Sequence, residues 1–531
     1  MTPLTYSLLA EPMAEHMVRR PLIAAGLDAL AAMPVLRRYG SHVYVNATLI
    51  AETIRLLPPG LRSDGLLALL PDVVRSGLGP GASSMRSGLR ALAIAERAWR
   101  NEPAWAPWAR AAAFDRECIE VRRGFRSRGP FGAEPALRDL RDELVHVAER
   151  LGRFLDVVSW GMVFAYVFFH LVHGLARRWA PGLPDEYAAL TIGLPAVASL
   201  EAHYDLHTLA RLVRAEPRLG AAVGAHDLER AAALLLGDDG GAAAAAFRRF
   251  LDLHGHRLTG RDLSCPTWSE SPAMVVELAL AAGMDATLDR AALARRRQAA
   301  TARIMAAFGS GPVGVVRRAA FGRLLGYAQR YYALRENMRY HADFFLARLR
   351  QVVLALGDIL VARERLATAD DVFWLDVEEL VDALDDPAPL AARIVARREA
   401  AARNALSPPP ETLDGEPPPA PAPDARILSG EVGAPGCCSG PARIVRDPRD
   451  FARIAAGDVL VAVYTDPGWT SILERAAGLV LEAGGILSHG AIVARELGIP
   501  ALVGVADATR RLRDGERLVL DGSAGTVTRE S

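Results

Sequence analysis

The sequence predicts a multidomain protein of the α plus α/β class, in which a large helical region precedes a smaller domain of strands and helices. Apolar residues recur three and four positions apart from residue 10 to about residue 405, the spacing of amphipathic helices. Eight prolines then fall between residues 408 and 423, and beyond them apolar and polar residues alternate as in strands. We expect a mainly helical domain over residues 1–406, a linker over 407–424 and a second domain over 425–531.

Helical spacing is clearest in four stretches of the first domain that place arginines on the opposite face, namely residues 136–150, 291–308, 315–333 and 340–363. The most apolar window, residues 154–169, contains Asp156. It is short for a membrane span, which needs about 20 residues, so we interpret it as a buried helix. The run Gly309-Ser310-Gly311-Pro312-Val313-Gly314 matches a dinucleotide fingerprint by letter, but it follows a helix, so it predicts a loop.

The proline-rich segment predicts an extended, semi-rigid connection that joins two bodies without packing into either. After it, period-two patterning predicts strands near residues 442–445, 458–464, 478–481, 501–505, 517–520 and 526–528. Helices are expected near residues 449–455 and 471–476, with a third beginning near Ser488. The order is that of a small layered α/β domain.

His489 is the most informative residue. It follows Gly484-Gly485-Ile486-Leu487-Ser488, in which two glycines allow a tight turn and Ser488 can cap a helix. Ile492, Val493 and Leu497 then define one apolar face, and Gly498 and Pro500 end the helix. The imidazole is thereby placed at a helix N-terminus, where the dipole favours an anion and a neutral histidine. His489 is therefore predicted to carry a phosphoryl group or to accept a proton.

Composition excludes several function classes. The chain has no lysine, since all 62 basic residues are arginine, which rules out a Walker A lysine, a pyridoxal phosphate Schiff base and any catalytic lysine. The formal net charge is zero, so neither nucleic acid nor a membrane surface is an expected partner. The four cysteines have no framework spacing and no targeting segment is visible, which favours the cytoplasm.

The run around His489 resembles the phosphohistidine motif of the swivelling domain in phosphoenolpyruvate-utilising enzymes, such as phosphoenolpyruvate synthase and rifampicin phosphotransferase. The preceding Thr465-Asp466-Pro467-Gly468-Trp469-Thr470 and the following Ala501-Leu502-Val503-Gly504-Val505 are similar to the same domain. Dikinases usually carry Thr-Ser-His-Ala where this chain has Leu487-Ser488-His489-Gly490, so the sequence leans towards the rifampicin phosphotransferase branch. That resemblance implies a β/β/α domain that swivels, docking with His489 facing the helical domain, and a large hydrophobic acceptor.

The resemblance also implies parts that this sequence does not display. In the family an ATP-grasp domain precedes the helical domain and uses lysine on the nucleotide phosphates, whereas this chain starts at what looks like the helical domain and lacks lysine. We therefore expect no bound cofactor. Under a phosphotransferase reading, a separate ATP-binding subunit would act in trans.

Substrate-binding candidates are drawn from family-like polar segments of the helical domain. His256, Arg257 and Asp262 stand in a segment similar to the family's Gly-His-Arg and Asp-Leu motifs, although Thr267 and Arg261 depart from the usual residues. Arg335 belongs to a second such segment, Arg335-Glu336-Asn337-Met338-Arg339. Tyr39 is added as a further polar candidate.

A metal site is not predicted. His203 and His207 lie four residues apart on an expected helix, a spacing that can chelate a metal, but the sequence offers no evident third ligand. His170 and His173 follow the buried apolar window and mark its polar end.

Three functions remain open. The first expectation is a lyase or cyclase of secondary metabolism, in which His489 acts as a phosphate-independent general base or acid on a large hydrophobic substrate, with Ser488 and Arg495 beside it. The alternative is a phosphotransferase that carries phosphohistidine at His489, with Arg495 and local N–H groups stabilising the anion. The third is a non-catalytic binding module.

Overall fold

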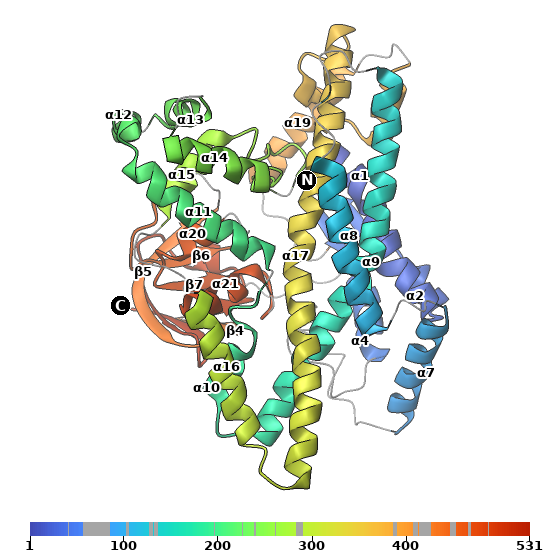
Figure 1. Ribbon diagram of the computed structural model, residues 1–531. Coiled ribbons are helices and arrows are strands. Elements are labelled where there is room, and N and C mark those ends of the chain that lie inside the picture. Colours follow the sequence, from blue (N-terminus) through green and yellow to red (C-terminus); the bar gives the residue numbers. More distant parts are fainter. Residues whose placement is uncertain are drawn as a thin grey trace.

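The computed structural model describes residues 1–530 except for 41, 57–84, 102–105, 127–130, 132–135, 196, 226, 238–240, 261, 283–289, 386–389, 407–412, 414–425, 447–452, 466–468 and 487. The predicted linker therefore lies outside the described residues apart from Leu413, as does most of the helix expected near residues 449–455. The remaining chain confirms the predicted class, because a mainly helical region precedes a mixed sheet (Figure 1).

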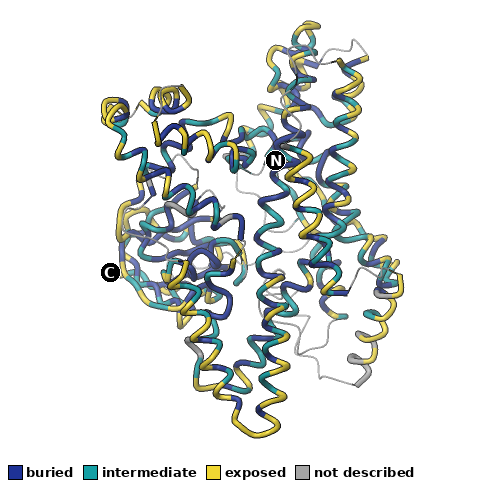
Figure 2. The backbone as a smooth tube through the Cα atoms, in the orientation of Figure 1, coloured by how far each residue is buried: buried dark blue, intermediate teal, exposed yellow. Residues whose placement is uncertain are grey.

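Two very long helices form the axis of the helical region. They are α9 (Leu137–Trp179) and α17 (Pro312–Ala362), which run side by side (Figure 1). Each joins two segments that the sequence predicts separately. No proline separates these segments, and Gly152, which lies between the two segments of α9, is accommodated within the helix. Phe154, Phe345 and Val352 are fully buried at their contact, and the middle of α17 is largely buried in Figure 2.

Several shorter helices accompany this axis, and they are α1 (Pro3–Ala14), α2 (Arg20–Ala24), α3 (Asp28–Ala31), α4 (Ala47–Leu56), α7 (Met85–Asn101), α8 (Pro107–Arg126), α18 (Val377–Ala383) and α19 (Ala391–Leu406). Of these, α1, α2 and α8 contact α9 directly. A 3-10 turn, Ala369–Trp374, inserts buried Val372 and Phe373 into the same core. A hairpin of β1 (Leu36–Tyr39) and β2 (His42–Val45) was not predicted; its two strands are only four residues each.

A second helical group lies apart from the long axis, above the sheet in Figure 1, and it consists of α11 (Ala198–Ala215), α12 (Gly220–Gly224), α13 (Leu228–Leu236), α14 (Gly241–His254) and α15 (Pro272–Ala281). Helices α10 (Pro184–Tyr187) and α16 (Arg290–Ala306) lie below the sheet. The first half of the predicted glycine-rich loop separates α16 from α17, whereas Pro312, Val313 and Gly314 belong to the first turn of α17.

The C-terminal domain contains one mixed sheet in the order β3-β10-β9-β5-β6-β7-β8-β4. Its strands are β3 (Ile427–Ser429), β4 (Glu431–Ala434), β5 (Cys437–Val445), β6 (Val459–Ala462), β7 (Gly478–Leu481), β8 (Ala501–Val503), β9 (Arg517–Asp521) and β10 (Thr526–Arg529). Strands β5 to β8 are parallel, whereas β3, β4, β9 and β10 pair antiparallel. The sequence predicts all but β3 and β4, which are short edge strands around Gly430.

The helices of this domain are α20 (Thr470–Leu473), α21 (His489–Leu497) and α22 (Ala508–Arg511). Helix α21 connects β7 to β8 in a parallel strand–helix–strand unit, so its N-terminus lies at the carboxyl end of β7. Val493 packs in the core that this domain shares with α11–α15. Ile492 points elsewhere: it joins Phe169, Leu200 and Tyr332 of the helical region in a separate apolar cluster.

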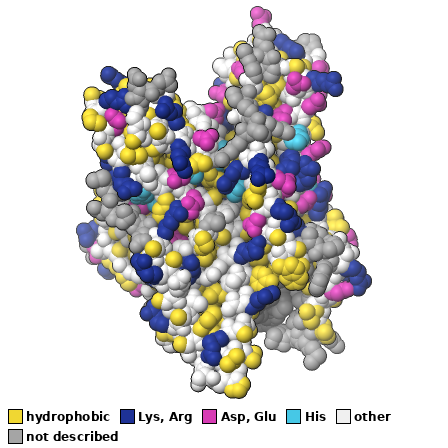
Figure 3. Space-filling view, in the orientation of Figure 1, with side chains coloured by type: hydrophobic (Ala, Val, Ile, Leu, Met, Phe, Trp, Pro, Cys, Tyr) yellow, Lys and Arg dark blue, Asp and Glu magenta, His cyan; other side chains and the backbone are white. Residues whose placement is uncertain are grey.

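Surface features agree with the neutral composition. Basic and acidic side chains are interspersed on the face drawn in Figure 3. The four cysteines are all free. Helix α9 is long and apolar enough to cross a membrane, but half of its most apolar window is buried inside the protein, so this is weak evidence for a span.

Ile492→Ala should loosen the docking of the C-terminal domain. The side chain is 2% exposed, and its loss leaves a cavity between the two parts of the protein, which typically costs about 2–5 kcal/mol. Hydrogen–deuterium exchange should become faster in α21 and in the facing part of α17. Ile427→Ala, at a position 56% exposed in the same domain, is the matched control; equal effects of the two substitutions would contradict the assignment of Ile492 to the docking contact.

Candidate functional site

Helix α21 begins as its sequence predicts. Ser488 has extended dihedral angles (φ −65°, ψ 157°), and its hydroxyl accepts a 3.4 Å hydrogen bond from the N–H of Ala491. Gly498 ends the helix in the left-handed conformation, at φ 71°. Both expected caps are confirmed, and they hold His489 in the first turn, where helical N–H groups and the dipole favour an anion.

Gly490 gives this helix its close approach to the sheet. A β-carbon built there would lie 2.5 Å from Leu481 Cδ1 and 2.6 Å from Thr465 Oγ1. Both distances are far below van der Waals contact, so only glycine fits without a shift. The backbone beside His489 is therefore held directly against β7.

His489 faces the helical region. Its Nδ1 lies 3.4 Å from Oε2 of Glu336 in the middle of α17. The two side chains are 11% and 6% exposed, so the contact is nearly closed to water. The docked arrangement expected of a swivelling domain is thus present, with the histidine turned towards α17 rather than towards its own sheet.

The electrostatics around Glu336 favour its ionised form. Burial alone would raise the pKa of this carboxyl group. The hydrogen bond from His489 and the charges of His489, Arg335 and Arg495 outweigh burial and hold the pKa of Glu336 below its ordinary value. A carboxylate can only accept hydrogen bonds, so the proton in the contact belongs to Nδ1 of His489. In the neutral imidazole this leaves the lone pair on Nε2.

The two predicted arginines have different positions. Arg335 Nη1 donates to Glu336 Oε1 at 3.0 Å, so this candidate does lie next to the His489 contact. Arg495 is buried, and its Nη1 donates to the carbonyl of Gly433, while Nη2 donates to the carbonyl of Ile486 and the hydroxyl of Tyr332. These bonds fix the turn ahead of His489; a direct role of Arg495 on a phosphoryl group stays a prediction.

A second buried carboxylate, Glu496, connects the same helix to the helical region. The N–H of Gly193 donates a hydrogen bond that both carboxylate oxygens of Glu496 accept, with N–O distances of 2.9 Å each. Burial raises the pKa of Glu496 to about 7, although the Gly193 N–H and the nearby Arg495 and Arg297 pull the pKa down. The carboxyl group of Glu496 therefore keeps its proton at pH values at which Glu336 is ionised.

The predicted substrate-binding residues His256 and Arg257 have contacts within the helical core. The ring of His256 stacks on Phe344 with centroids 3.5 Å apart, and its Nε2 lies 3.2 Å from the carbonyl of Tyr340. Burial, followed by the charge of Arg257, lowers the pKa of His256 well below its ordinary value. The Arg257 guanidinium lies over the ring of Trp268 at 4.8 Å. Their described contacts are structural, and their predicted substrate role stays a prediction.

Asp262 fixes the start of α1. Its carboxylate accepts from the N–H and hydroxyl of Thr2, from the hydroxyl of Thr5, and from the N–H and hydroxyl of Ser264, at 2.6–3.0 Å. Burial would raise the pKa of Asp262, but these bonds lower it. Tyr39 is 55% exposed at the end of β1. The contacts described here place neither residue beside His489, unlike Arg335.

Sequence reasoning missed Glu336 and Glu474. Glu336 stands in the segment Arg335-Glu336-Asn337-Met338-Arg339, in which sequence reasoning points only to Arg335 as a site residue. The one local indication of a role for Glu336 is that it is a glutamate within a polar part of a predicted helix. Glu474 meets His203 and His207 in space, although it is far from them in sequence. Neither contact can be read from local spacing.

A pocket of about 330 Å³ lies between α8 and α9. Its lining consists of Glu120, Val121, Arg123, Gly124, Phe125, His146 and Arg150. None of the substrate-binding residues predicted from the sequence lines it.

Comparison with known proteins identifies the class of the site. Residues 454–525 match the family described as the mobile domain of phosphoenolpyruvate-utilising enzymes, which includes His489. Residues 153–336 match the family described as the fourth domain of rifampicin phosphotransferase, which includes Glu336. The two sides of the His489–Glu336 contact therefore come from two recognised parts of one enzyme class.

Three relatives illustrate this similarity. Rifampicin phosphotransferase of Streptomyces sviceus is 30% identical over 64% of this chain and 40% of its own length. Chondramide synthase of Chondromyces crocatus is 30% identical over 65% of this chain and 10% of its own length. Phosphoenolpyruvate synthase of Aeropyrum pernix is 43% identical over 19% of this chain and 12% of its own. The chain is thus similar to phosphoenolpyruvate-utilising enzymes, and to rifampicin phosphotransferase in particular, and it spans less than half the length of these relatives.

These relatives correct the first functional expectation. A lyase or cyclase with a phosphate-independent His489 was expected because the chain shows no parts of a phosphoryl relay. The relatives include several rifampicin phosphotransferases, and the match covers the mobile domain that contains His489. The expectation of a lyase or cyclase is therefore wrong, and the comparisons favour the phosphotransferase alternative.

Glu496→Gln should make stability less dependent on pH. Because the pKa of Glu496 is raised from 4.5 to about 7 in the folded protein, the unfolded chain loses this proton first as the pH rises. Glu496 therefore lowers the free energy of unfolding progressively as the pH rises from 4.5 to about 7. Above that range the loss reaches about 3 kcal/mol. Calorimetric Tm values at pH 5 and pH 8 should differ less in Glu496→Gln than in wild type. Glu530→Gln, on the surface of the same domain, should leave the wild-type difference in place; an unchanged difference in Glu496→Gln would contradict the assignment.

Proposed function

We propose that the protein is a phosphotransferase in which His489 carries a phosphoryl group between a donor site and an acceptor held by the helical region. The observation that carries this proposal is the position of His489 at the N-terminus of α21, with Nδ1 directed at the buried carboxylate of Glu336. Relatives with the same two domains are phosphotransferases.

The His489–Glu336 contact supports Nε2 as the nucleophile. With Nδ1–H donating to Glu336, the ring has the tautomer that places the nucleophilic lone pair on Nε2. Once phosphorylated on Nε2 the ring is cationic, and the Glu336 carboxylate stabilises it. The N–H groups of the first turn of α21 stabilise the phosphoryl oxygens.

The transfer has two balanced steps. In the first, Nε2 attacks the phosphorus of the donor; an N–P bond forms, an O–P bond breaks, and the donor oxygen leaves with the electron pair. In the second, a hydroxyl oxygen of the acceptor attacks the same phosphorus; an O–P bond forms, the N–P bond breaks, and the electron pair returns to Nε2. The acceptor hydroxyl loses its proton to solvent or to a nearby base.

The donor site is proposed to lie outside this sequence. Lysine, which the family uses on nucleotide phosphates, does not occur among the 531 residues. We infer that an ATP-binding partner subunit phosphorylates His489 in trans. The acceptor is inferred to be a large, hydrophobic, hydroxyl-bearing molecule of secondary metabolism, because the relatives include rifampicin phosphotransferases and a chondramide synthase.

His489→Ala should abolish phosphorylation, and Glu336→Gln should slow it by at least about tenfold, as expected when a group that orients a reacting histidine is lost. A glutamine can donate to Nδ1 and so permit the tautomer that places the proton on Nε2. The measurement is intact mass under alkaline conditions after incubation with ATP and the partner subunit, and His42→Ala on the β2 strand is the control. A phosphoryl mass increment that persists in His489→Ala would refute the proposed carrier.

The chain by itself should show no saturable ATP binding. Without lysine the nucleotide phosphates lack the cation that the family uses on them. Isothermal titration at millimolar ATP provides the measurement. Saturable micromolar binding by the purified chain would contradict the proposal of a donor site in trans.

A further inference from the structure

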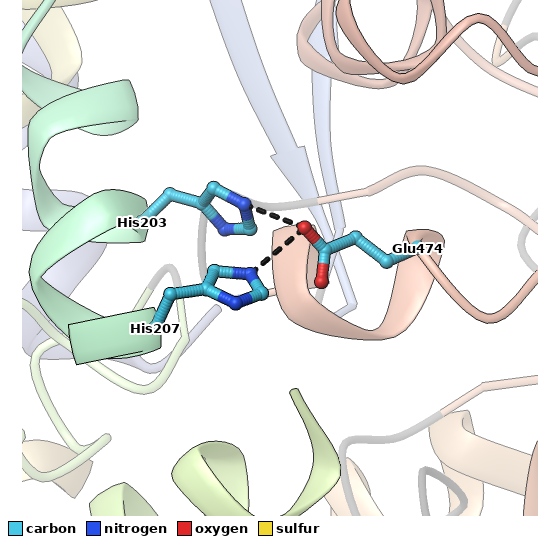
Figure 4. Close-up of side chains that lie close together, drawn as sticks. All are labelled: His203, His207 and Glu474. Carbon is cyan, nitrogen blue, oxygen red and sulfur yellow. Dashed lines mark hydrogen bonds and ion pairs between the residues drawn. The ribbon is translucent and has the colours of Figure 1, made fainter. Parts of the chain in front are cut away.

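A cluster of two histidines and one glutamate joins the helical region to the C-terminal domain. His203 and His207 lie one turn apart on α11, and Glu474 follows directly after α20. The Nε2 atoms of His203 and His207 lie 2.7 and 2.8 Å from the same oxygen, Oε1 of Glu474 (Figure 4). The ligand atoms of all three residues lie within 4.8 Å of one another.

The cluster is deeply buried and poorly satisfied. The side chains of His203 and Glu474 are 1% and 0% exposed. Neither ring nitrogen of His203 has a hydrogen-bond partner of acceptable geometry, and neither does Oε2 of Glu474. The 2.7 Å contact between His203 and Glu474 therefore has the length of a hydrogen bond without its direction. Buried polar groups without hydrogen-bond partners lower the stability of a folded protein, so a further partner such as an ion is expected here.

The chemistry of the three groups is that of a transition-metal site. Two imidazole Nε2 atoms four residues apart on one helix, completed by a carboxylate, form the His₂Glu ligand set that binds Zn²⁺ in proteins. Tetrahedral Zn²⁺ holds N and O ligands at about 2.0–2.2 Å, which places ligand atoms about 3.3 Å from one another. To hold the ion, the present Nε2–Oε1 distances of 2.7 and 2.8 Å have to increase by about half an ångström. His207 is 18% exposed, so its side of the cluster admits a water as a fourth ligand.

We propose that His203, His207 and Glu474 bind a divalent transition-metal ion, Zn²⁺ in the first instance, and that this ion fastens the C-terminal domain in its docked position. Two ligands belong to the helical region and one to the C-terminal domain, so the coordination bonds exist only while the two are in contact. This position is also the one in which His489 faces Glu336. This proposal does not depend on whether His489 is phosphorylated, because the three metal ligands lie outside the His489–Glu336 contact.

Zinc titration of the full chain tests the site. After treatment with EDTA and its removal, wild-type protein should take up one Zn²⁺ per chain, measured by calorimetry and elemental analysis. Co²⁺ in its place should give the visible absorption bands of a low-coordinate site. Glu474→Gln and His207→Gln should each weaken binding at least about tenfold, as expected for the loss of a ligand. Glu201→Gln, which alters an exposed carboxylate on the same helix, should bind as wild type does.

The docking role is tested on the same proteins by hydrogen–deuterium exchange. Zn²⁺ should slow exchange in α11 and α20 of wild type and of Glu201→Gln, but not of Glu474→Gln. Circular dichroism establishes that each variant is folded. Absence of stoichiometric Zn²⁺ uptake by wild type, or uptake that survives in both Glu474→Gln and His207→Gln, would overturn the proposal and leave two imidazoles beside one buried carboxylate without a metal.

Discussion

The buried contact between the Glu336 carboxylate and the His489 imidazole is the constraint on which the arrangement of this protein depends. A carboxylate in the middle of a long helix, 6% exposed, is unfavourable unless charge and hydrogen bonds compensate for lost water. Arg335 supplies part of that compensation from the same helix, and His489 and Arg495 supply the rest from the other domain. Movement of the C-terminal domain therefore changes the environment of Glu336 as well as that of the histidine.

The neighbouring carboxylates Glu336 and Glu496 divide the charge at this boundary unequally. Glu336 stays ionised because a hydrogen bond and nearby positive charges outweigh its burial, whereas burial outweighs the Gly193 N–H and the charges of Arg495 and Arg297 at Glu496, which retains a proton more readily. Each carboxylate raises the energetic cost of ionising the other, so this division limits repulsion within a buried contact. Apolar packing around Ile492 completes the boundary without adding charge.

Much of the fold could be predicted from local sequence chemistry. The caps of α21, the loop between α16 and α17, and the strands β5 to β10 follow from glycine, serine and alternating apolar residues, whose effects reach only a few positions. The full lengths of α9 and α17 are less evident from the sequence, because the two helices are stabilised along their length by packing against each other.

The site was predicted only in part for the same reason. His489 and Ser488 are marked by their own neighbours in sequence, but Glu336 and Glu474 acquire meaning only through residues more than a hundred positions away. Conversely, His256 and Asp262 stand in polar, family-like segments, yet the bonds that hold them serve helix packing and the start of α1. Sequence alone cannot distinguish a polar residue that supports the fold from one that faces a substrate.

The close approach at Gly490 has a consequence for exchanging parts between relatives. Dikinases usually have alanine after the histidine, and here a methyl group at that position would overlap Thr465 Oγ1 and Leu481 Cδ1. The histidine helix and the two residues beneath it, Thr465 and Leu481, are therefore sterically matched to each other. A chimaera that imports an alanine-type helix into this domain needs the matching residues at 465 and 481 as well, so the boundary of such a graft should lie ahead of residue 465.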